Sequence, residues 1–417
     1  MTEARMQPPR GPLREMATIA AHHAVHCVLP LTLRLRRRLA RCGYERLLVA
    51  YRLDFLRRHR AHPEGVAYRL VDAQPVARGV QAYRLQAPPG VRHRGGDTLL
   101  VRWRNADDEV QAMLRTMGWR GDEPVRLRTA SSAFAPGRRR TVDVATALRE
   151  IVDFRAALEL GAVQAVPGQP PGVLGAWPRL QPRSYSVSGI APAPQGEVVE
   201  ILVSTVEQTL RSVDGSAATW PGRCSGHLAR LRPGIDELHG WPLAFPLALQ
   251  PRPAAPLLVV ATGIAAAGPL FELRHRPPQG PVWLVCGLRQ FDAGQPFTRR
   301  LLEHAAAHPA LRLDIALSRA DAPPAGDLPP NVPPNVHLHG RCRVQDVLQA
   351  EAARFDAHFR EGGDTVVIGH TSMGDDVRAW LRRAFVAGGQ SADEAQAAAL
   401  LVQLEQQLRV QYSLSGR

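Results

Sequence analysis

The chain has 417 residues, enough for two or three domains with sizeable cores. A hydrophobic content of 45% and a charged content of 22% are ordinary for a soluble globular protein. The net charge of +14, which comes from arginine because the chain has no lysine, favours an acidic partner: nucleic acid, a membrane surface or an acidic protein.

Two absences narrow these choices. The sequence has neither a zinc-finger spacing nor a basic stripe interleaved with aromatic residues, so we expect no nucleic-acid partner. Its 5 cysteines are scattered and odd in number, which fits reduced thiols in the cytoplasm rather than a disulfide framework.

Residues 1–64 form a strongly basic stretch. Arginines in 34–41 and 57–60 follow helix-like periodicity, and the apolar run before them is too short and too polar to span a bilayer. We expect a solvated helical extension, with a membrane-surface helix or a docking arm for an acidic partner as alternatives. The histidines and cysteine within 22–27 lack a second ligand group, so we expect no metal site.

Alternating strands begin at Gly65. Residues 68–71 and 80–85 predict strands, and the acidic start of 107–114 predicts a helix N-terminus. A second amphipathic helix is expected over 141–154, before a segment rich in glycine and proline.

The segment Leu180–Gly189 predicts a strand that is entered through a proline. Because neighbouring strand residues point to opposite faces, Arg183 and Tyr185 share one face, and Ser184 and Ser186 share the other. A guanidinium beside a flat ring and a hydroxyl suits an aromatic cofactor that carries phosphate. An ordinary half-buried edge strand is the alternative.

Two further features follow this strand. Residues 197–206 predict another strand, and 222–228 place glycine, a small residue and a hydroxyl at a loop-to-helix junction. Such a junction presents backbone N–H groups to an anion.

Beyond Pro251 the pattern changes to apolar strands alternating with helices. Continuous apolar runs at 256–261, 282–287, 311–317 and 364–369 are typical of buried parallel strands. These runs predict an α/β domain that binds ligands at the carboxyl ends of its strands. A last amphipathic helix is expected over 392–408.

Together these motifs resemble the ferredoxin–NADP reductase superfamily. Arg183-Ser184-Tyr185-Ser186 resembles its R-x-Y-S motif for FAD, and the residues before it look most like the diflavin reductases, the family of cytochrome P450 reductase and the sulfite reductase flavoprotein. The segment 95–105 resembles the family's turn into a barrel strand.

The resemblance implies a β plus α/β fold. An antiparallel FAD-binding barrel would span 65–250, with a reduced helical insert at about 106–175, and a parallel-sheet NADP-binding domain would span 251–417. Residues 1–60 are too short for the FMN domain that precedes this module in the family, so electrons would leave FAD to a separate carrier.

Site residues follow from the matched motifs. For FAD the resemblance implies Arg183, Tyr185, Ser186, Ser188, Gly222, Cys224, Ser225 and, stacked on the flavin, Tyr412; Ser186 would also be the catalytic residue. For NADP it implies Thr262, Gly263, Arg289, Ser318, Arg319, Arg341, Arg343, Gln345, Gly369 and Met373.

The resemblance also shows departures. Val259 and Ala261 replace glycines of the pyrophosphate turn, Ala266 replaces a proline, and Ile368 replaces the cysteine near the nicotinamide. We therefore expect a cytoplasmic flavoprotein reductase that passes electrons from NADPH through FAD to an acidic flavodoxin-like protein or a haemoprotein, as the sulfite reductase flavoprotein does. The alternatives are a generic NADPH–flavodoxin or haemoprotein reductase and a non-catalytic FAD-binding subunit.

Overall fold

The computed structural model describes residues 53, 56–58, 61–62, 64–129, 138–159, 168–211, 217–243, 252, 254–322 and 332–415. Almost all of the predicted basic extension, including residues 22–27, lies outside the described residues.

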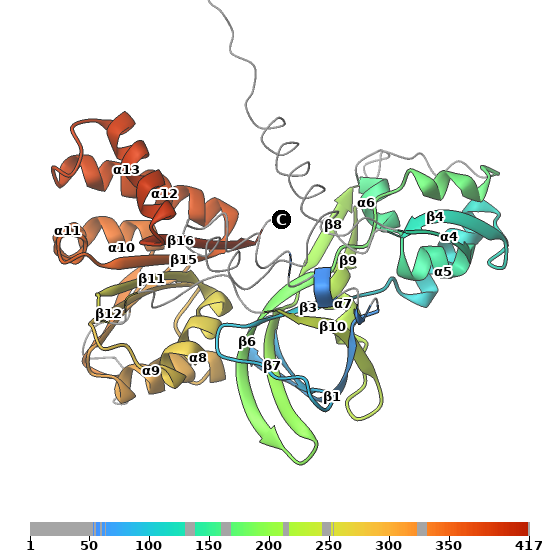
Figure 1. Cartoon of the computed structure of the whole chain (residues 1–417), viewed down its shortest axis with the longest axis horizontal. Helices are drawn as coiled ribbons and strands as arrows, with labels where there is room; N and C mark the ends of the chain where they lie inside the picture. Colours follow the sequence, from blue (N-terminus) through green and yellow to red (C-terminus); the bar gives the residue numbers. More distant parts are fainter. Residues whose placement is uncertain are drawn as a thin grey trace, which may run out of the picture.

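Six antiparallel strands, counted over the described residues, close a barrel in the order β1-β10-β3-β6-β7-β2 (Figure 1). Tyr68, Leu99, Val187 and Ile201 are among the buried side chains inside it, because alternate residues of each strand point inward. The strands are β1 (Val66–Ala77), β2 (Val80–Gln86), β3 (Thr98–Val101), β6 (Arg183–Ala193), β7 (Gly196–Ser204) and β10 (Glu237–Leu243). A hairpin of β8 (Glu207–Arg211) and β9 (Ala217–Pro221) leads to α7 (Arg223–Ala229).

The insert between β3 and β6 has a core of its own, with Val110, Leu127, Leu148 and Trp177 buried together. It contains α4 (Asp107–Met117), β4 (Pro124–Thr129), β5 (Arg138–Asp143), α5 (Val144–Glu150), α6 (Phe154–Glu159) and the 3-10 turn η1 (Pro171–Gly175). Figure 1 shows it on the side of the barrel away from the parallel sheet.

The helix predicted at 141–154 is wrong at both ends, because α5 begins at Val144 and ends at Glu150. Residues 141–143 finish β5, which pairs with β4, and Asp143 then caps α5 by accepting a hydrogen bond from the Thr146 N–H at 2.7 Å. The insert is therefore a mixed unit rather than a purely helical one.

The C-terminal half is an α/β domain. In its described part, six parallel strands follow the order β14-β13-β12-β11-β15-β16. They are β11 (Leu257–Thr262), β12 (Val282–Leu288), β13 (Leu311–Leu317), β14 (Val336–Gly340), β15 (Asp364–His370) and β16 (Val410–Ser415). The expected barrel followed by a parallel-sheet domain is confirmed.

Helices cover both faces of this sheet (Figure 1). One face carries η2 (Gly263–Ala266), α8 (Ala267–His275) and α9 (Pro296–Ala307), and its core also takes in Val76, Ala82 and Leu202 of the barrel. The other carries α10 (Val344–Ala350), α11 (Ala352–Arg360), α12 (Thr371–Ala387) and α13 (Glu394–Gln406). The barrel therefore packs on the α8–α9 side, and the opposite face of the sheet is separate from it.

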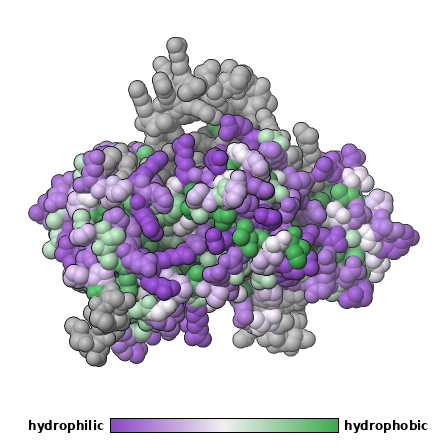
Figure 2. Space-filling view, turned by 90° about the horizontal axis from the view of Figure 1, so that it is seen from below, coloured by the Kyte–Doolittle hydropathy of each residue, from purple (hydrophilic) through white to green (hydrophobic). Residues whose placement is uncertain are grey.

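The surface seen from below is mainly hydrophilic, with hydrophobic residues in small separate groups (Figure 2). In the described ranges the large hydrophobic side chains that are exposed, such as Ile235 and Val402, are far apart in the sequence. Single exposed hydrophobic residues of this kind are normal on a protein surface.

Candidate functional site

Strand β6 carries the first group of predicted site residues. It pairs with β3 so that Tyr185 lies opposite Leu99 and Ser186 lies opposite Thr98. Arg183 is exposed, whereas Tyr185 is partly buried and packs against the barrel core. The predicted arrangement of a cation beside an aromatic ring on one strand face is present.

Cys224, in the first turn of α7, lies close to both residues, since it interacts electrostatically with Tyr185 and Arg183. Burial raises the pKa of the Cys224 thiol to about 12, although Tyr185 and Arg183 both oppose this rise. Burial also raises the pKa of the Tyr185 phenol well above its ordinary value. The thiol and the phenol are thus neutral at pH 7, and Arg183 supplies the charge.

Gly222 caps the N-terminus of α7 and has a steric reason to be glycine. A Cβ atom there would lie 2.6 Å from the Ser225 Oγ and 2.9 Å from the Val206 Cβ. Ser225 is buried, and its Oγ accepts a hydrogen bond from the Val206 N–H at 3.4 Å. The predicted loop-to-helix junction is present, and Ser225 holds this turn together.

Buried charges of the insert brace the same helix, and no sequence motif indicates them. Arg223 on α7 forms an ion pair with Asp153 at 3.2 Å. The Arg155 guanidinium donates to the Pro221 carbonyl at 2.7 Å and pairs with Glu109. Because 66 residues separate Arg155 from Pro221, no local pattern could indicate the contact.

Ser186 and Ser188 lie where the barrel meets the α/β domain. A Cβ atom on Gly268 of α8 would be 3.0 Å from the Ser186 Cβ, so glycine allows the helix to approach β6 closely. The Ser188 hydroxyl donates to the Glu200 carboxylate at 2.8 Å, and Arg300 of α9 donates to both oxygens of Glu200, at 2.5 and 2.9 Å. This bidentate pair joins the two domains beside Ser186.

The electrostatics of this junction favour the ion pair. Burial raises the pKa of Glu200, but the Arg300 guanidinium and the Ser188 hydroxyl together hold it below its ordinary value. Glu200 is therefore ionised at pH 7 and keeps Arg300 in place.

Four predicted NADP residues meet where the strand order reverses, between β11 and β15. A Cβ atom on Gly369 would lie 2.3 Å from the Thr262 Oγ1 and 2.8 Å from the Met373 Cε, so these residues are in direct contact. Gly263 and Gly369 both have positive φ, at 54° and 152°. In open α/β sheets, ligands bind at this kind of position.

Val259 and Ala261, which stand where the family has glycines, lie on β11. Both are fully buried and pack toward α8 and α9, and Ile368 is buried on that same side. They fill the core beneath the turn.

A second group of predicted NADP residues lies at the carboxyl ends of β12, β13 and β14. The Arg319 N–H donates to the Arg289 carbonyl at 2.9 Å, and Ser318 precedes Arg319 at the end of β13. Arg289 and Arg319 are exposed, and no carboxylate in the described ranges pairs with either. Arg341, which has a φ of 46°, bonds with the exposed Asp321 at 2.7 and 3.2 Å.

Arg343 and Gln345 lie at the start of α10 and reach toward α12. The Arg343 guanidinium is 3.9 Å from the Asp376 carboxylate, and the Gln345 amide donates to the same carboxylate at 3.4 Å. Both side chains thus contact α12, the helix that begins beside Gly369.

Tyr412 is not brought together with the barrel residues. It lies on β16, is 5% exposed, and packs with the α10–α13 side of the sheet, opposite the side that meets the barrel. The Arg378 guanidinium lies 4.3 Å from its ring centroid. The sequence indicated a terminal aromatic, whereas alternation of Val410, Tyr412 and Leu414 places the ring in the core.

No protein-family model and no curated protein matches this chain. Among the helices of the described residues, none combines the length and apolar character needed to cross a bilayer. Over the same residues, no group of three or more histidine, cysteine and acidic side chains suits a metal ion.

Proposed function

We propose that this chain is an NADPH-dependent FAD reductase that delivers electrons to a separate acceptor protein. The observation that carries the proposal is the distribution of guanidinium groups with no carboxylate partner among the described residues. Arg183 lies on the barrel beside Tyr185, and Arg289 and Arg319 lie at strand ends of the other domain. The interface between these domains contains Ser186.

The barrel residues fit the phosphate end of FAD. Arg183 offers a guanidinium fork that no carboxylate of the described residues occupies, which suits phosphate oxygens, and the neighbouring thiol of Cys224 is neutral. Tyr185 provides a ring that is only partly covered. Ser186 would face the reacting edge of the flavin, because it lies at the domain junction.

The strand ends of the α/β domain fit a phosphorylated nucleotide. Arg289 and Arg319 together make a site for a dianion, which favours NADPH over NADH. Thr262, Gly263 and Gly369 lie at the reversal of strand order, where the rest of a dinucleotide would be held.

When bound, FAD would accept a hydride and release single electrons. The chain would bind both cofactors, hold the domains together through Glu200 and Arg300, and exclude water where α8 meets β6. The net charge of +14 would attract an acidic flavodoxin-like protein or a haemoprotein, which makes a sulfite reductase-like role in the cytoplasm the proposed context.

A second candidate is a subunit that keeps FAD but uses NADPH poorly. The burial of Tyr412 away from the barrel and the side chains of Val259 and Ala261 in β11 favour it. Colour without reduction by NADPH would distinguish it from an active reductase.

The experiment for the FAD site compares two arginine variants of the full chain. Arg183→Ala should weaken FAD binding roughly 10- to 150-fold, because a hydrogen bond to a charged group is worth about 1.5–3 kcal/mol. Arg120→Ala, in the insert and 2.8 Å from Asp122, is the control and should retain FAD. Equal FAD content in the two purified variants, with equal dissociation constants, would remove the assignment of Arg183.

A further inference from the structure

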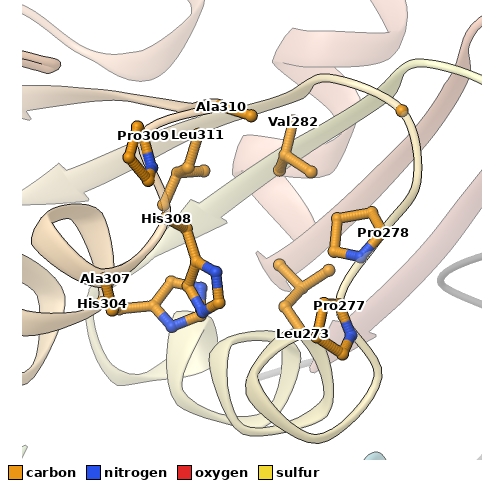
Figure 3. A pocket seen from close by; sticks show the side chains of 11 residues that line it. Leu273, Pro277, Pro278, Val282, His304, Ala307, His308, Pro309, Ala310 and Leu311 are labelled. Atoms are coloured by element: carbon orange, nitrogen blue, oxygen red, sulfur yellow. The ribbon is translucent and has the colours of Figure 1, made fainter.

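A cavity of about 160 Å³ lies at the edge of the α/β domain opposite the arginine groups (Figure 3). It is open to solvent on one side and is lined by the last turns of α8 and α9 and by the first residues of β12 and β13. Leu273, Val282 and Leu311 form its apolar walls, and Pro277 and Pro278 lie beside Leu273. None of these residues belongs to the predicted cofactor sites.

Two histidines, His304 and His308, line this cavity, and His304 is the more deeply buried of them. Its side chain lines the cavity and is 8% exposed, and no hydrogen bond joins its ring to any described residue. Its ring nitrogens are not among the fully buried atoms that lack a partner, so they are reached from the cavity, where an occupant can form the hydrogen bond that the described residues do not. His308, one turn later, places its ring centroid 4.5 Å away.

The protonation state of His304 limits which occupant fits. Burial, with help from His308 and Arg274, lowers its pKa to about 4. The imidazole is therefore neutral at pH 7, with one N–H donor and one acceptor nitrogen. A neutral hydroxyl group suits it better than an anion, because an anion would have to be desolvated against apolar walls.

The size of the cavity limits the rest of the occupant. An apolar protein cavity of about 150 Å³ accommodates benzene. A cluster of waters would need two to four polar partners for each molecule, and the walls here are mostly hydrocarbon.

We propose that this cavity binds a small phenol-type aromatic molecule, with its ring against the leucine, valine and proline side chains and its hydroxyl on His304. The site is independent of the proposed function. It also lies near the domain junction, since His304 is one turn after Arg300 on α9. A ligand there would contact the helix that holds Glu200.

The test uses 4-fluorophenol and toluene as probes on the full chain, followed by fluorine and proton NMR. The wild type should bind 4-fluorophenol with a dissociation constant on the order of 0.1–1 mM. His304→Phe should weaken 4-fluorophenol roughly 2- to 10-fold, the effect of one hydrogen bond, and should not weaken toluene.

Two exposed alanines of α9 provide a matched pair of variants. Ala307 lines the cavity and Ala306 does not, and both are exposed, so neither substitution should disturb folding. Ala307→Trp should abolish binding of both probes, and Ala306→Trp should preserve it. The proposal would be overturned if the wild type did not bind 4-fluorophenol at 10 mM, on the order of ten times the weakest expected constant. It would also be overturned if either probe still bound to Ala307→Trp, or if His304→Phe left the ratio of the two probes' dissociation constants unchanged.

Discussion

Replacing Asp314 by asparagine perturbs a buried network that joins the three strands carrying the arginines of the nucleotide site. Asp314 lies on β13 and is completely buried. Its carboxylate accepts hydrogen bonds from Arg312 at 2.6 and 3.1 Å, from the Trp283 indole of β12 at 2.7 Å, and from His339 of β14 at 2.7 Å.

The magnitude follows from what the substitution leaves behind. Removing one partner of a buried ion pair costs about 3–5 kcal/mol. Here the cost lies at the lower end, because Arg312 is 21% exposed and keeps Glu351 at 2.7 Å. We expect Asp314→Asn to lower the free energy of unfolding by about 3 kcal/mol, roughly a 150-fold change in the folded-to-unfolded ratio.

This loss should depend on pH. Burial alone would raise the pKa of Asp314, but hydrogen bonds from His339, Arg312 and Trp283 hold it well below its ordinary value. A carboxylate with a depressed folded-state pKa stabilises the fold above its unfolded pKa of about 3.9 and loses that effect as pH falls. The difference between wild type and Asp314→Asn should therefore be full at pH 7 and shrink below about pH 4.

The assay is urea unfolding monitored by tryptophan fluorescence, with Asp321→Asn as the control. Asp321 also pairs with an arginine, but both side chains are 72% exposed, so water screens the pair and its loss should have little effect on stability. If Asp314→Asn destabilises the protein no more than Asp321→Asn, the network does not hold these strands together as described.

Two further predictions concern the nucleotide site and the domain junction. Arg319→Ala should lower kcat/KM for NADPH roughly 10- to 150-fold and leave NADH unchanged, because the lost charge-assisted hydrogen bond is worth about 1.5–3 kcal/mol. Arg299→Ala, an exposed arginine on α9, is the control, and an unchanged NADPH preference in Arg319→Ala would contradict the assignment. Glu272 packs against the barrel turn before β3, and burial raises its pKa to about 7, with Asp97 adding to the shift and Arg276 opposing it. Because the folded state holds this proton more tightly, wild-type stability should fall as pH rises from about 4.5 to 7. Glu272→Gln should thus match the wild type near pH 5 and exceed it at pH 8 in thermal melts, and the same difference at both values would refute the argument.

The sequence predicted the elements whose signals are local. Continuous apolar runs identified β11, β12, β13 and β15, because strands buried on both faces need hydrophobic residues throughout. The polar alternation of β14, Val336-His337-Leu338-His339, resembles a loop or an edge strand, so it was missed. Strand β16 alternates in the same way, so its sequence indicates a terminal aromatic for the flavin, whereas Tyr412 lies in the sheet.

The part of the site that the sequence did not indicate depends on contacts between distant residues. Arg300 and Glu200 are 100 positions apart, and each reads alone as a surface charge. Only the packing of α9 on the barrel gives the pair its bidentate geometry. From the sequence alone, Gly268 is only a residue that weakens a helix. The structure shows its reason, because Ser186 of β6 lies directly against it.

The most direct test of the proposed function is the visible spectrum of the purified protein before and after anaerobic addition of NADPH. We predict a yellow protein with a flavin spectrum that bleaches promptly with NADPH. A yellow protein that ignores NADPH but is reduced by dithionite would contradict the reductase and support the binding subunit. A colourless protein that cannot be reconstituted with FAD would contradict the account built on Arg183, Tyr185 and Cys224.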